Sequence, residues 1–411
     1  MLKVEADLIS EAKMVLDFNW TGEYTKPGPR LYPHQWSWDS ALFSIGYSHY
    51  DQERATRELT HLLDAQWENG FLPQIVFNPH FGTYFPGIDF WHASESPEAP
   101  AHVKTSGIVQ PPVHSTAALR VYQSAEDTSG AREFLEYAFP RLAAWHEYLY
   151  RERDPEREGL VYIRHPWESG MDNSPMWDSV MERMWLSPEQ IPEYRRVDTH
   201  VVASGDRPLD AAYDRFAYLV KLFADRGYDE AKIRGDCPFL VQDVLFNALL
   251  CQADKDLAQI AWALGEDAAY FEERAEKSAR AMNEKLWDEE HAIYLDFDLA
   301  VGRSIYSCAA PNLAPSLREY PTKGRRGAWW ACWRGRVSAS PTRASRPCPA
   351  TIATASRSPR PGTGAGRSGS TSTGSSRRVW IATATRTKPG ACESRSFPSA
   401  AMRATTSTLI R

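Results

Sequence analysis

Trp167-Glu168-Ser169-Gly170-Met171-Asp172-Asn173-Ser174-Pro175-Met176-Trp177-Asp178 is the most informative stretch of the chain. A single aspartate, Asp172, lies there between two tryptophans, among Gly, Asn, Ser and Pro residues that favour turns over regular helix or strand. Loops on a rigid scaffold commonly carry function. Aromatic rings beside a carboxylate suit a sugar, because its C–H faces stack on rings and its hydroxyl groups need acceptors. A buried tryptophan cluster with Asp172 as a turn cap explains the composition equally well.

A second cluster has the same chemistry, Tyr32-Pro33-His34-Gln35-Trp36-Ser37-Trp38-Asp39-Ser40. Asp39 precedes an apolar run, so it could serve only as a helix N-cap. Capping does not explain Trp36 and Trp38, since alternating tryptophans beside a polar turn are costly unless they contact something. We therefore predict that the two clusters form one sugar site, which requires Asp172 to lie near the Tyr32–Asp39 segment.

These two stretches, together with Gly70-Phe71-Leu72-Pro73-Gln74-Ile75-Val76-Phe77, resemble the mannosylglycerate and glucosylglycerate hydrolases of glycoside hydrolase family 63. The resemblance runs from about residue 18 to about residue 322. It implies an all-α fold, an (α/α)6 toroid built from six helical hairpins. It also implies inverting hydrolysis of an α-glycoside with a small acidic aglycone, and the sequence leaves open which sugar is bound.

Inverting hydrolysis needs an acid that protonates the leaving oxygen and a base that activates water, roughly 6.5–9.5 Å apart. By resemblance, Asp172 is the general acid, and flanking Trp167 and Trp177 would raise its pKa by desolvation. Asp39 would orient the sugar hydroxyl groups. The resemblance assigns the sugar subsite to the remaining aromatic and amide residues: Tyr32, Trp36, Trp38, Tyr84, Gln110 and Trp167.

The acidic aglycone points to a carboxylate-binding arginine. By resemblance, Arg207 and Tyr213 lie where the family holds the glycerate carboxylate, which a guanidinium binds bidentately. A surface charge for Arg207 and core packing for Tyr213 are the alternatives. The family's general base is the Glu of a Tyr-Glu-Tyr-Phe-Asp string. Ser407 occupies its place here, and a hydroxyl group cannot replace a carboxylate base.

Composition narrows the protein class. The chain has 411 residues, enough for a substantial core, and 15 tryptophans. Its acidic amphipathic N-terminus lacks the features of a signal peptide, and no stretch is long enough to span a bilayer, so a cytoplasmic location is expected. The six cysteines show no metal-ligand spacing, and no motif requires a cofactor or a metal. We expect Cys237, Cys251 and Cys308 to be free thiols.

The net charge of −6 hides a division at Lys323. Residues 324–411 carry fifteen Arg, one Lys and one Glu, a net charge of +15, whereas residues 1–323 carry −21. Such an asymmetry ordinarily suggests a basic arm that binds nucleic acid. Here Trp329, Trp330, Trp333 and scattered cysteines argue against such an arm, and we expect neither a nucleic-acid nor a membrane partner.

A shifted reading frame explains residues 324–411 better. Suppose that each codon is read from one nucleotide earlier, so that its first two bases become the last two bases of the new codon. Residues Thr363 to Gly374 then permit the sequence Tyr-Trp-Arg-Gly-Pro-Val-Trp-Ile-Asn-Val-Asn-Trp. Cys348 to Thr354 permits Val-Pro-Ser-Tyr-Asp-Arg-Asp, and Ala404 to Ile410 permits Gly-Tyr-Tyr-Glu-Tyr-Phe-Asp. These strings look like the family's own. On this hypothesis, Thr363 and Gly364 replace the Tyr and Trp expected at the subsite.

Residues 1–323 are predicted to form a helical but truncated (α/α)6 catalytic body, and residues 324–411 a largely disordered frameshift product. Because the toroid is incomplete and the general base is missing, we expect this chain to be inactive. Apolar periodicity predicts helices from Asp51, over 132–151 with a kink at Pro140, and over 210–223, 239–253 and 266–287. Strand signals are confined to 160–163 and 293–297. The aromatic clusters are expected in connections between helices.

Two other function classes stay open. A sugar-binding pseudoenzyme would keep Asp39 and Arg207 without turnover. A sugar epimerase would use paired basic residues, and His34, His114 and His165 are the candidates, although each also suits a structural hydrogen bond.

Resequencing the locus around the Lys323 codon tests the frameshift hypothesis. We expect a one-nucleotide change of frame there, followed by the hidden Tyr-Trp-Arg-Gly-Pro-Val-Trp string. An unbroken frame without that string would refute the hypothesis and favour a genuine basic arm.

Overall fold

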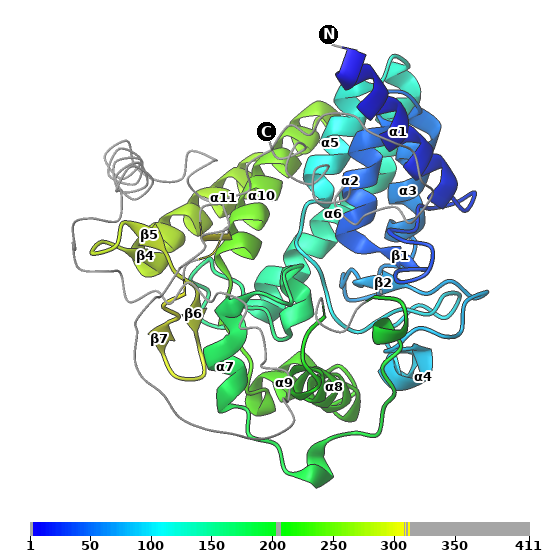
Figure 1. Ribbon diagram of the computed structural model, residues 1–411. Helices are drawn as coiled ribbons and strands as arrows, with labels where there is room; N and C mark the ends of the chain where they lie inside the picture. Colours follow the sequence, from blue (N-terminus) through cyan, green and yellow to red (C-terminus); the bar gives the residue numbers. More distant parts are fainter. Residues whose placement is uncertain (1–2, 203–206, 308, 310, 313–411) are drawn as a thin grey trace, which may run out of the picture. The chain divides into compact units, whose positions relative to one another are not determined.

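The structure is a computed structural model that describes residues 3–202, 207–307, 309 and 311–312. The predictions made for residues 324–411, including Thr363, Gly364 and Ser407, lie outside these residues, as does Cys308. The described part is mainly helical (Figure 1). Its α-helices are α1 (Lys3–Asn19), α2 (Ser37–Tyr47), α3 (Gln52–Leu63), α4 (Ile88–Trp91), α5 (His114–Ser124), α6 (Thr128–Arg153), α7 (Asp178–Arg183), α8 (Asp210–Asp225), α9 (Glu230–Asp236), α10 (Val244–Leu264) and α11 (Ala269–Ala281).

Short strands and tighter turns connect these helices. Strands β1 (Gln35–Trp36) and β2 (Ile75–Val76) pair antiparallel, with Gln35 opposite Val76. Two further antiparallel sheets lie in the described residues. One consists of β3 (Val241–Gln242), β6 (Phe297–Asp298) and β7 (Arg303–Ser304). The other consists of β4 (Trp287–Asp288) and β5 (Ile293–Tyr294). Short 3-10 turns cover Ala93–Glu95, Pro166–Ser169, Pro175–Trp177, Pro188–Gln190 and Asp198–His200.

The helices pack as consecutive pairs, which confirms the expected hairpins. Within the described residues, α2 packs on α3, α5 on α6 and α10 on α11. The first members of these pairs also contact one another, α2 with α5 and α5 with α10, so that they form one layer of helices backed by α3, α6 and α11 (Figure 1). This two-layer order of hairpins is the arrangement expected of an (α/α)6 toroid.

Capping residues explain where several helices begin. The Asp51 side chain accepts a hydrogen bond from the Arg54 amide at the start of α3, as predicted. Asp127 and Asp243 cap α6 and α10 in the same way. The expected start of a helix at residue 239 is wrong, because Val241–Gln242 form β3 before Asp243 caps α10.

Other boundaries also differ from the sequence prediction. The helix expected over 266–287 spans only Ala269–Ala281 and continues as a π-helical turn, Met282–Leu286. The strand expected over 160–163 is reduced to one bridge between Ile163 and Val241. The single strand expected over 293–297 is split into β5 and β6.

Asp39 is not an N-cap. Trp36 precedes α2 without a side-chain cap, and Asp39 is the third residue of the helix. Trp38 and Asp39 therefore belong to the first turn of α2. The expectation that they lie in a connection between helices is wrong.

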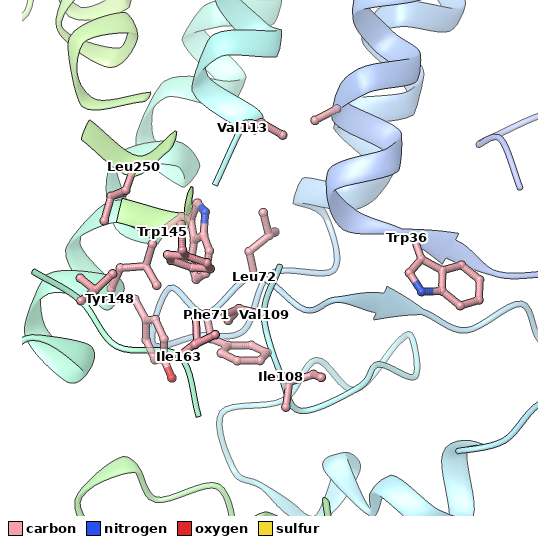
Figure 2. Close-up of a cluster of buried hydrophobic side chains, with 14 of the residues drawn as sticks. Trp36, Phe71, Leu72, Ile108, Val109, Val113, Trp145, Tyr148, Ile163 and Leu250 are labelled. Carbon is pink, nitrogen blue, oxygen red and sulfur yellow. The ribbon is translucent and has the colours of Figure 1, made fainter. Parts of the chain in front are cut away.

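A continuous core joins the hairpins to the loops between them. It includes Trp145 and Tyr148 of α6, Leu250 of α10, and Phe71 and Leu72 of the loop before β2 (Figure 2). Cys237 is a buried free thiol in this core, as predicted, and Cys251 of α10 is also buried. Because aromatic side chains from α6 and from the loops interlock, the loops are held on the helical scaffold.

A buried ionic cluster fixes the start of the Trp167–Asp178 loop. The Glu168 carboxylate accepts two hydrogen bonds from Arg153, both of 3.2 Å, and one of 2.7 Å from the Arg164 amide. It also accepts a bond of 3.2 Å from the Val109 amide. Glu230 completes the charge balance, 2.8 Å from Arg153 Nε. Burial acts to raise the pKa of Glu168, but Arg153 and Arg164 outweigh this effect and lower the pKa below its usual value, so the group stays ionised.

Replacing Glu168 with Gln is expected to lower the free energy of unfolding by about 3–5 kcal/mol, because two guanidinium groups would lose a buried counter-charge. Urea unfolding at pH 7 measures this change. The matched control is Glu136→Gln, which removes an exposed helix-surface pair with Arg132 and should cost less than about 0.5 kcal/mol. Equal costs for the two variants would contradict the role given to Glu168.

Candidate active site

A cavity of about 250 Å³ opens between three segments of the chain. Four of the residues predicted for the site line it, namely Tyr32, Tyr84, Arg207 and Tyr213. The remaining lining residues are Arg30, Leu31, Phe81, Thr83, Phe85, Val197, Asp198, His200 and Val201. Residues 30–32 and 81–85 are far in sequence from the third group, which comprises 197–201, Arg207 and Tyr213. The fold therefore brings together the residues that were assigned to a sugar and to a carboxylate.

Arg207 is the centre of the polar wall of this cavity. Its Nε donates to Asp198 Oδ2 at 2.8 Å, and its two terminal nitrogens donate to the hydroxyl groups of Tyr32 at 3.2 Å and Tyr213 at 3.3 Å. A guanidinium has five N–H groups, so two are not used by these three bonds. The side chain is partly buried and is not the surface charge considered as the alternative.

The charge of Arg207 is secured by its surroundings. Burial acts to lower its pKa, but Tyr32 and Asp198 raise it above the usual value. Tyr213 combines the two roles considered for it, because the ring is buried in α8 while its hydroxyl group reaches the cavity and donates to Asp198 at 3.1 Å. Arg207 therefore stays charged at the cavity wall, with hydroxyl groups beside it.

Asp172 lies near this wall but does not line the cavity. Its carboxyl group is half-buried, and burial raises its pKa, while nearby Arg207 acts in the opposite direction. Burial raises the pKa of Tyr32 and Tyr84, and the charge of Asp172 adds to this effect. The loop that carries Asp172 lies beside the Tyr32–Asp39 segment, because Gly170 approaches the Trp38 ring closely. That Asp172 belongs to a sugar site stays a prediction.

The tryptophans around Asp172 shape its loop. Trp177 is buried, and its Nε1 donates to the carbonyl oxygen of Met171 at 3.0 Å, which fixes the backbone just before Asp172. Trp167 is half-buried, with its ring centroid 4.4 Å from that of His165 and 6.2 Å from that of Tyr213. The first tryptophan thus packs towards the cavity wall and the second holds the loop.

The two aromatic clusters meet at Gly170. This residue has φ 68°, and a Cβ atom built there would lie 2.7 Å from the Trp38 ring. Glycine is therefore required both by the backbone conformation and by the close approach of the indole. The Trp38 amide also donates to Gln110 Oε1 at 3.2 Å. Trp38, Gln110 and the Asp172 loop consequently form one packed unit, although none of them lines the cavity.

Trp36 and Asp39 have contrasting environments. Trp36 is only 5% exposed, with its ring against those of Tyr32, His34 and Tyr84. It supports the two cavity tyrosines from behind. Asp39 is half-buried at the start of α2, and burial raises its pKa from 3.8 to about 7, against the opposing effect of hydrogen bonds from its own amide and Trp38.

Comparison with known proteins places the chain in a family. Residues 32–350 match the model of the mannosylglycerate hydrolase MGH1-like glycoside hydrolase domain. The chain belongs to this family, within glycoside hydrolase family 63. It is 65% identical to a mannosylglycerate hydrolase of Rubrobacter radiotolerans over 329 residues, which cover 80% of this chain and 74% of that protein. Identity with a glucosylglycerate hydrolase of Mycolicibacterium hassiacum is 36%, over 75% of this chain and 71% of that protein.

Solved structures agree with this family assignment. A family 63 mannosylglycerate hydrolase from Thermus thermophilus, in complex with Tris and D-glycerate, aligns with a TM-score of 0.74 at 40% identity. The same enzyme in complex with glucose aligns with a TM-score of 0.70 at 41% identity. Each alignment covers 79% of this chain and 76% of the other. The predicted all-α, (α/α)6 glycosidase fold is confirmed.

The three histidines considered for epimerase chemistry have structural roles in this family member. His34 Nδ1 accepts from the Asn78 amide, and His114 Nε2 bonds Ser37 Oγ at 2.8 Å. His165 bonds the Trp167 amide and the Phe216 carbonyl oxygen. Burial lowers the pKa of His34 to about 4 and those of His114 and His165 to about 3, so all three are neutral. None lines the cavity, which removes the observation that favoured an epimerase.

Asp198 is the site residue that sequence reasoning missed. It lies in a loop, and its partners Arg207 and Tyr213 follow at intervals without helical or strand periodicity. The only sequence signal is its place two residues after Arg196.

In the part of the chain that the structure describes, no group of three or more His, Cys, Asp or Glu side chains could hold a metal ion. No described helix is long and apolar enough to cross a bilayer.

The raised pKa of Asp39 predicts how stability depends on pH. Because the folded protein binds this proton more tightly than the unfolded chain does, ionisation of Asp39 costs stability as pH rises from about 4 to about 7. Asp39→Asn should therefore raise the melting temperature more at pH 8 than at pH 4. Asp89→Asn, in the first turn of α4 but exposed, is the matched control and should show no such difference. Thermal melts at both pH values test this, and equal shifts for Asp39→Asn would contradict it.

Proposed function

We propose that this site binds an α-glycoside of glycerate, glucosylglycerate or mannosylglycerate, as the named relatives do. The observation that carries the proposal is the Arg207 guanidinium at the cavity wall, held by Asp198 and flanked by the hydroxyl groups of Tyr32 and Tyr213. A fixed guanidinium with unused N–H groups suits a carboxylate, which accepts two parallel hydrogen bonds from it. The hydroxyl groups supply further donors for the same anion.

The cavity size supports a small aglycone. A volume of about 250 Å³ is below the range of roughly 300–1,000 Å³ for drug-sized ligands, and it suits a three-carbon acid next to a sugar. A Thermus thermophilus relative with the same fold has been crystallised with D-glycerate and with glucose. These ligands are the two halves of glucosylglycerate.

Asp172 is proposed as the general acid. The glycosidic oxygen joins the sugar to glycerate, so it would lie next to the carboxylate-binding wall, and Asp172 lies near Arg207. Its raised pKa favours the protonated form, which can pass a hydrogen to the leaving oxygen as the bond to the sugar breaks. Asp39, in the first turn of α2, is proposed to accept hydrogen bonds from the sugar hydroxyl groups, aided by Trp38 beside it.

In the same step, an inverting reaction needs a carboxylate base that removes a proton from the water as it attacks the sugar from the opposite face. We propose that this chain lacks that base, because Ser407 stands at its position in the sequence. The chain would then bind its ligand without turnover, and only a chain with the corrected reading frame would be a working hydrolase. The cytoplasmic location expected from the sequence stays a prediction.

Two measurements on two forms of the protein test this proposal. The full chain should bind D-glycerate in calorimetry but release no detectable glucose or mannose from either glycoside. The frame-corrected protein should hydrolyse at least one of them. In that protein, Asp172→Asn should lower kcat by about 100-fold or more, because general acid catalysis is lost.

The matched control is Asp178→Asn in the frame-corrected protein. Asp178 belongs to the same loop but is exposed, so kcat should stay within about twofold of the unchanged protein. Release of sugar at ordinary rates by the chain as it stands would refute the missing-base proposal. Equal activities of the Asp172 and Asp178 variants would refute the assignment of the acid.

A further inference from the structure

The Asp198 carboxylate accepts four hydrogen bonds from side chains of the protein. Its Oδ2 accepts from Arg196 Nη2 at 2.7 Å, Arg207 Nε at 2.8 Å and Tyr213 OH at 3.1 Å, and its Oδ1 accepts from Arg196 Nε at 3.1 Å. Oδ2 is therefore shared by three donors of the protein, whereas Oδ1 accepts one bond and keeps one lone pair. Asp198 is only 6% exposed. It lines the cavity, and the oxygen that holds Arg207 is already used by the protein.

Arg196 lies behind the cavity wall. Its guanidinium is 3.8 Å from the centroid of the Tyr213 ring, and it donates to the Pro208 carbonyl oxygen at 2.8 Å. It does not line the cavity. Its other carboxylate partner, Asp210, has a side chain that is 87% exposed, so water screens that charge. The main electrostatic partner of Arg196 is therefore the enclosed Asp198.

The three side chains form a row with a defined charge. Arg207 and Asp198 alone would be neutral, and a neutral pair attracts an anionic ligand weakly. Arg196 adds a second positive charge, so that the row Arg196–Asp198–Arg207 carries a net charge of +1. The carboxylate in the middle also occupies the Nε side of Arg207, which leaves its terminal nitrogens directed towards the two cavity tyrosines.

We propose that Asp198 and Arg196 are positioning residues that select ligands with a carboxylate. Asp198 sets the orientation of the Arg207 guanidinium, and Arg196 offsets the negative charge that this orientation requires. In this proposal Asp198 acts through Arg207, and Arg196, which does not line the cavity, acts through Asp198. This inference rests on the proposed function, because it assumes that a glycerate carboxylate binds at Arg207.

The orientation of Arg207 and the charge beside it have opposite effects on the binding of an anion when Asp198 is replaced by Asn. Asp198→Asn removes a negative charge beside Arg207, so charge alone would strengthen the binding of an anion. Loss of orientation would weaken the binding, because the amide of Asn has one acceptor oxygen, whereas the carboxylate of Asp198 has two for the side chains that donate to it. We expect weaker binding.

The experiment is calorimetry on the full chain with D-glycerate and with D-glyceramide, its neutral amide. The unchanged chain should prefer glycerate. Arg196→Gln should reduce the ratio of glycerate to glyceramide affinity by about tenfold, because Asp198 would then neutralise Arg207. Arg196→Lys keeps the charge and should restore most of the ratio. Asp198→Asn should weaken glycerate binding by about tenfold, which corresponds to losing one well-aligned ionic hydrogen bond.

Arg226→Gln is the matched control, because Arg226 forms an exposed ion pair with Asp236 away from the cavity. It should leave both affinities unchanged. An unchanged ratio in Arg196→Gln, or tighter glycerate binding by Asp198→Asn, would overturn the inference while leaving the proposed ligand intact. Absence of glycerate binding by the unchanged chain would overturn both. Thermal melts verify folding, and the two substitutions test the inference independently, so one folded variant is sufficient.

Discussion

The site depends on the buried contact between the Glu168 carboxylate and Arg153. Through its remaining lone pairs this carboxylate binds the amide of Val109, next to Gln110, and that of Arg164, just ahead of the Asp172 loop. Two loops from distant parts of the sequence are thereby tied to the C-terminal end of helix α6. Replacing water around four buried charges is expensive, and the expense is offset only when every partner is in place. Position of the loops is therefore coupled to the integrity of the core.

The carboxylate-binding wall is organised by the same principle at the surface of the cavity. Asp198 holds the Arg207 guanidinium as Glu168 holds that of Arg153, through hydrogen bonds to a carboxylate that also binds other groups of the protein. The difference is exposure, because the Arg207 end faces a cavity and keeps N–H groups that the protein does not use. The chain thus uses one type of interaction twice, once to hold backbone segments together and once to hold a binding group ready.

Local strings of sequence predicted much of this arrangement. The helices followed from capping residues such as Asp51 and from apolar periodicity. The family resemblance singled out Tyr32, Arg207 and Tyr213, which the structure brings to one cavity, whereas the role of Asp172 stays a prediction. Failures occurred where the deciding partner is distant in sequence. Residues 239–241 were predicted to be helical, but Val241 pairs with β6. Asp39 was considered as a helix cap, but α2 begins at Ser37, directly after β1. Asp198 gave no periodic signal, since its partners are chosen by loop geometry.

The enclosed histidines have a consequence for the response to acidity. Imidazole is the usual group that titrates between pH 5 and 8, yet His34, His114 and His165 are all held neutral well below that range. Asp39 instead titrates near pH 7, and the pKa of Asp172 is displaced in the same direction. In this chain the side chains at the site whose pKa is displaced upwards, towards neutrality, are therefore carboxyl groups in a half-buried environment. The polarity of that environment, set by Trp38 and its neighbours, would tune the response without any change in the titrating residues.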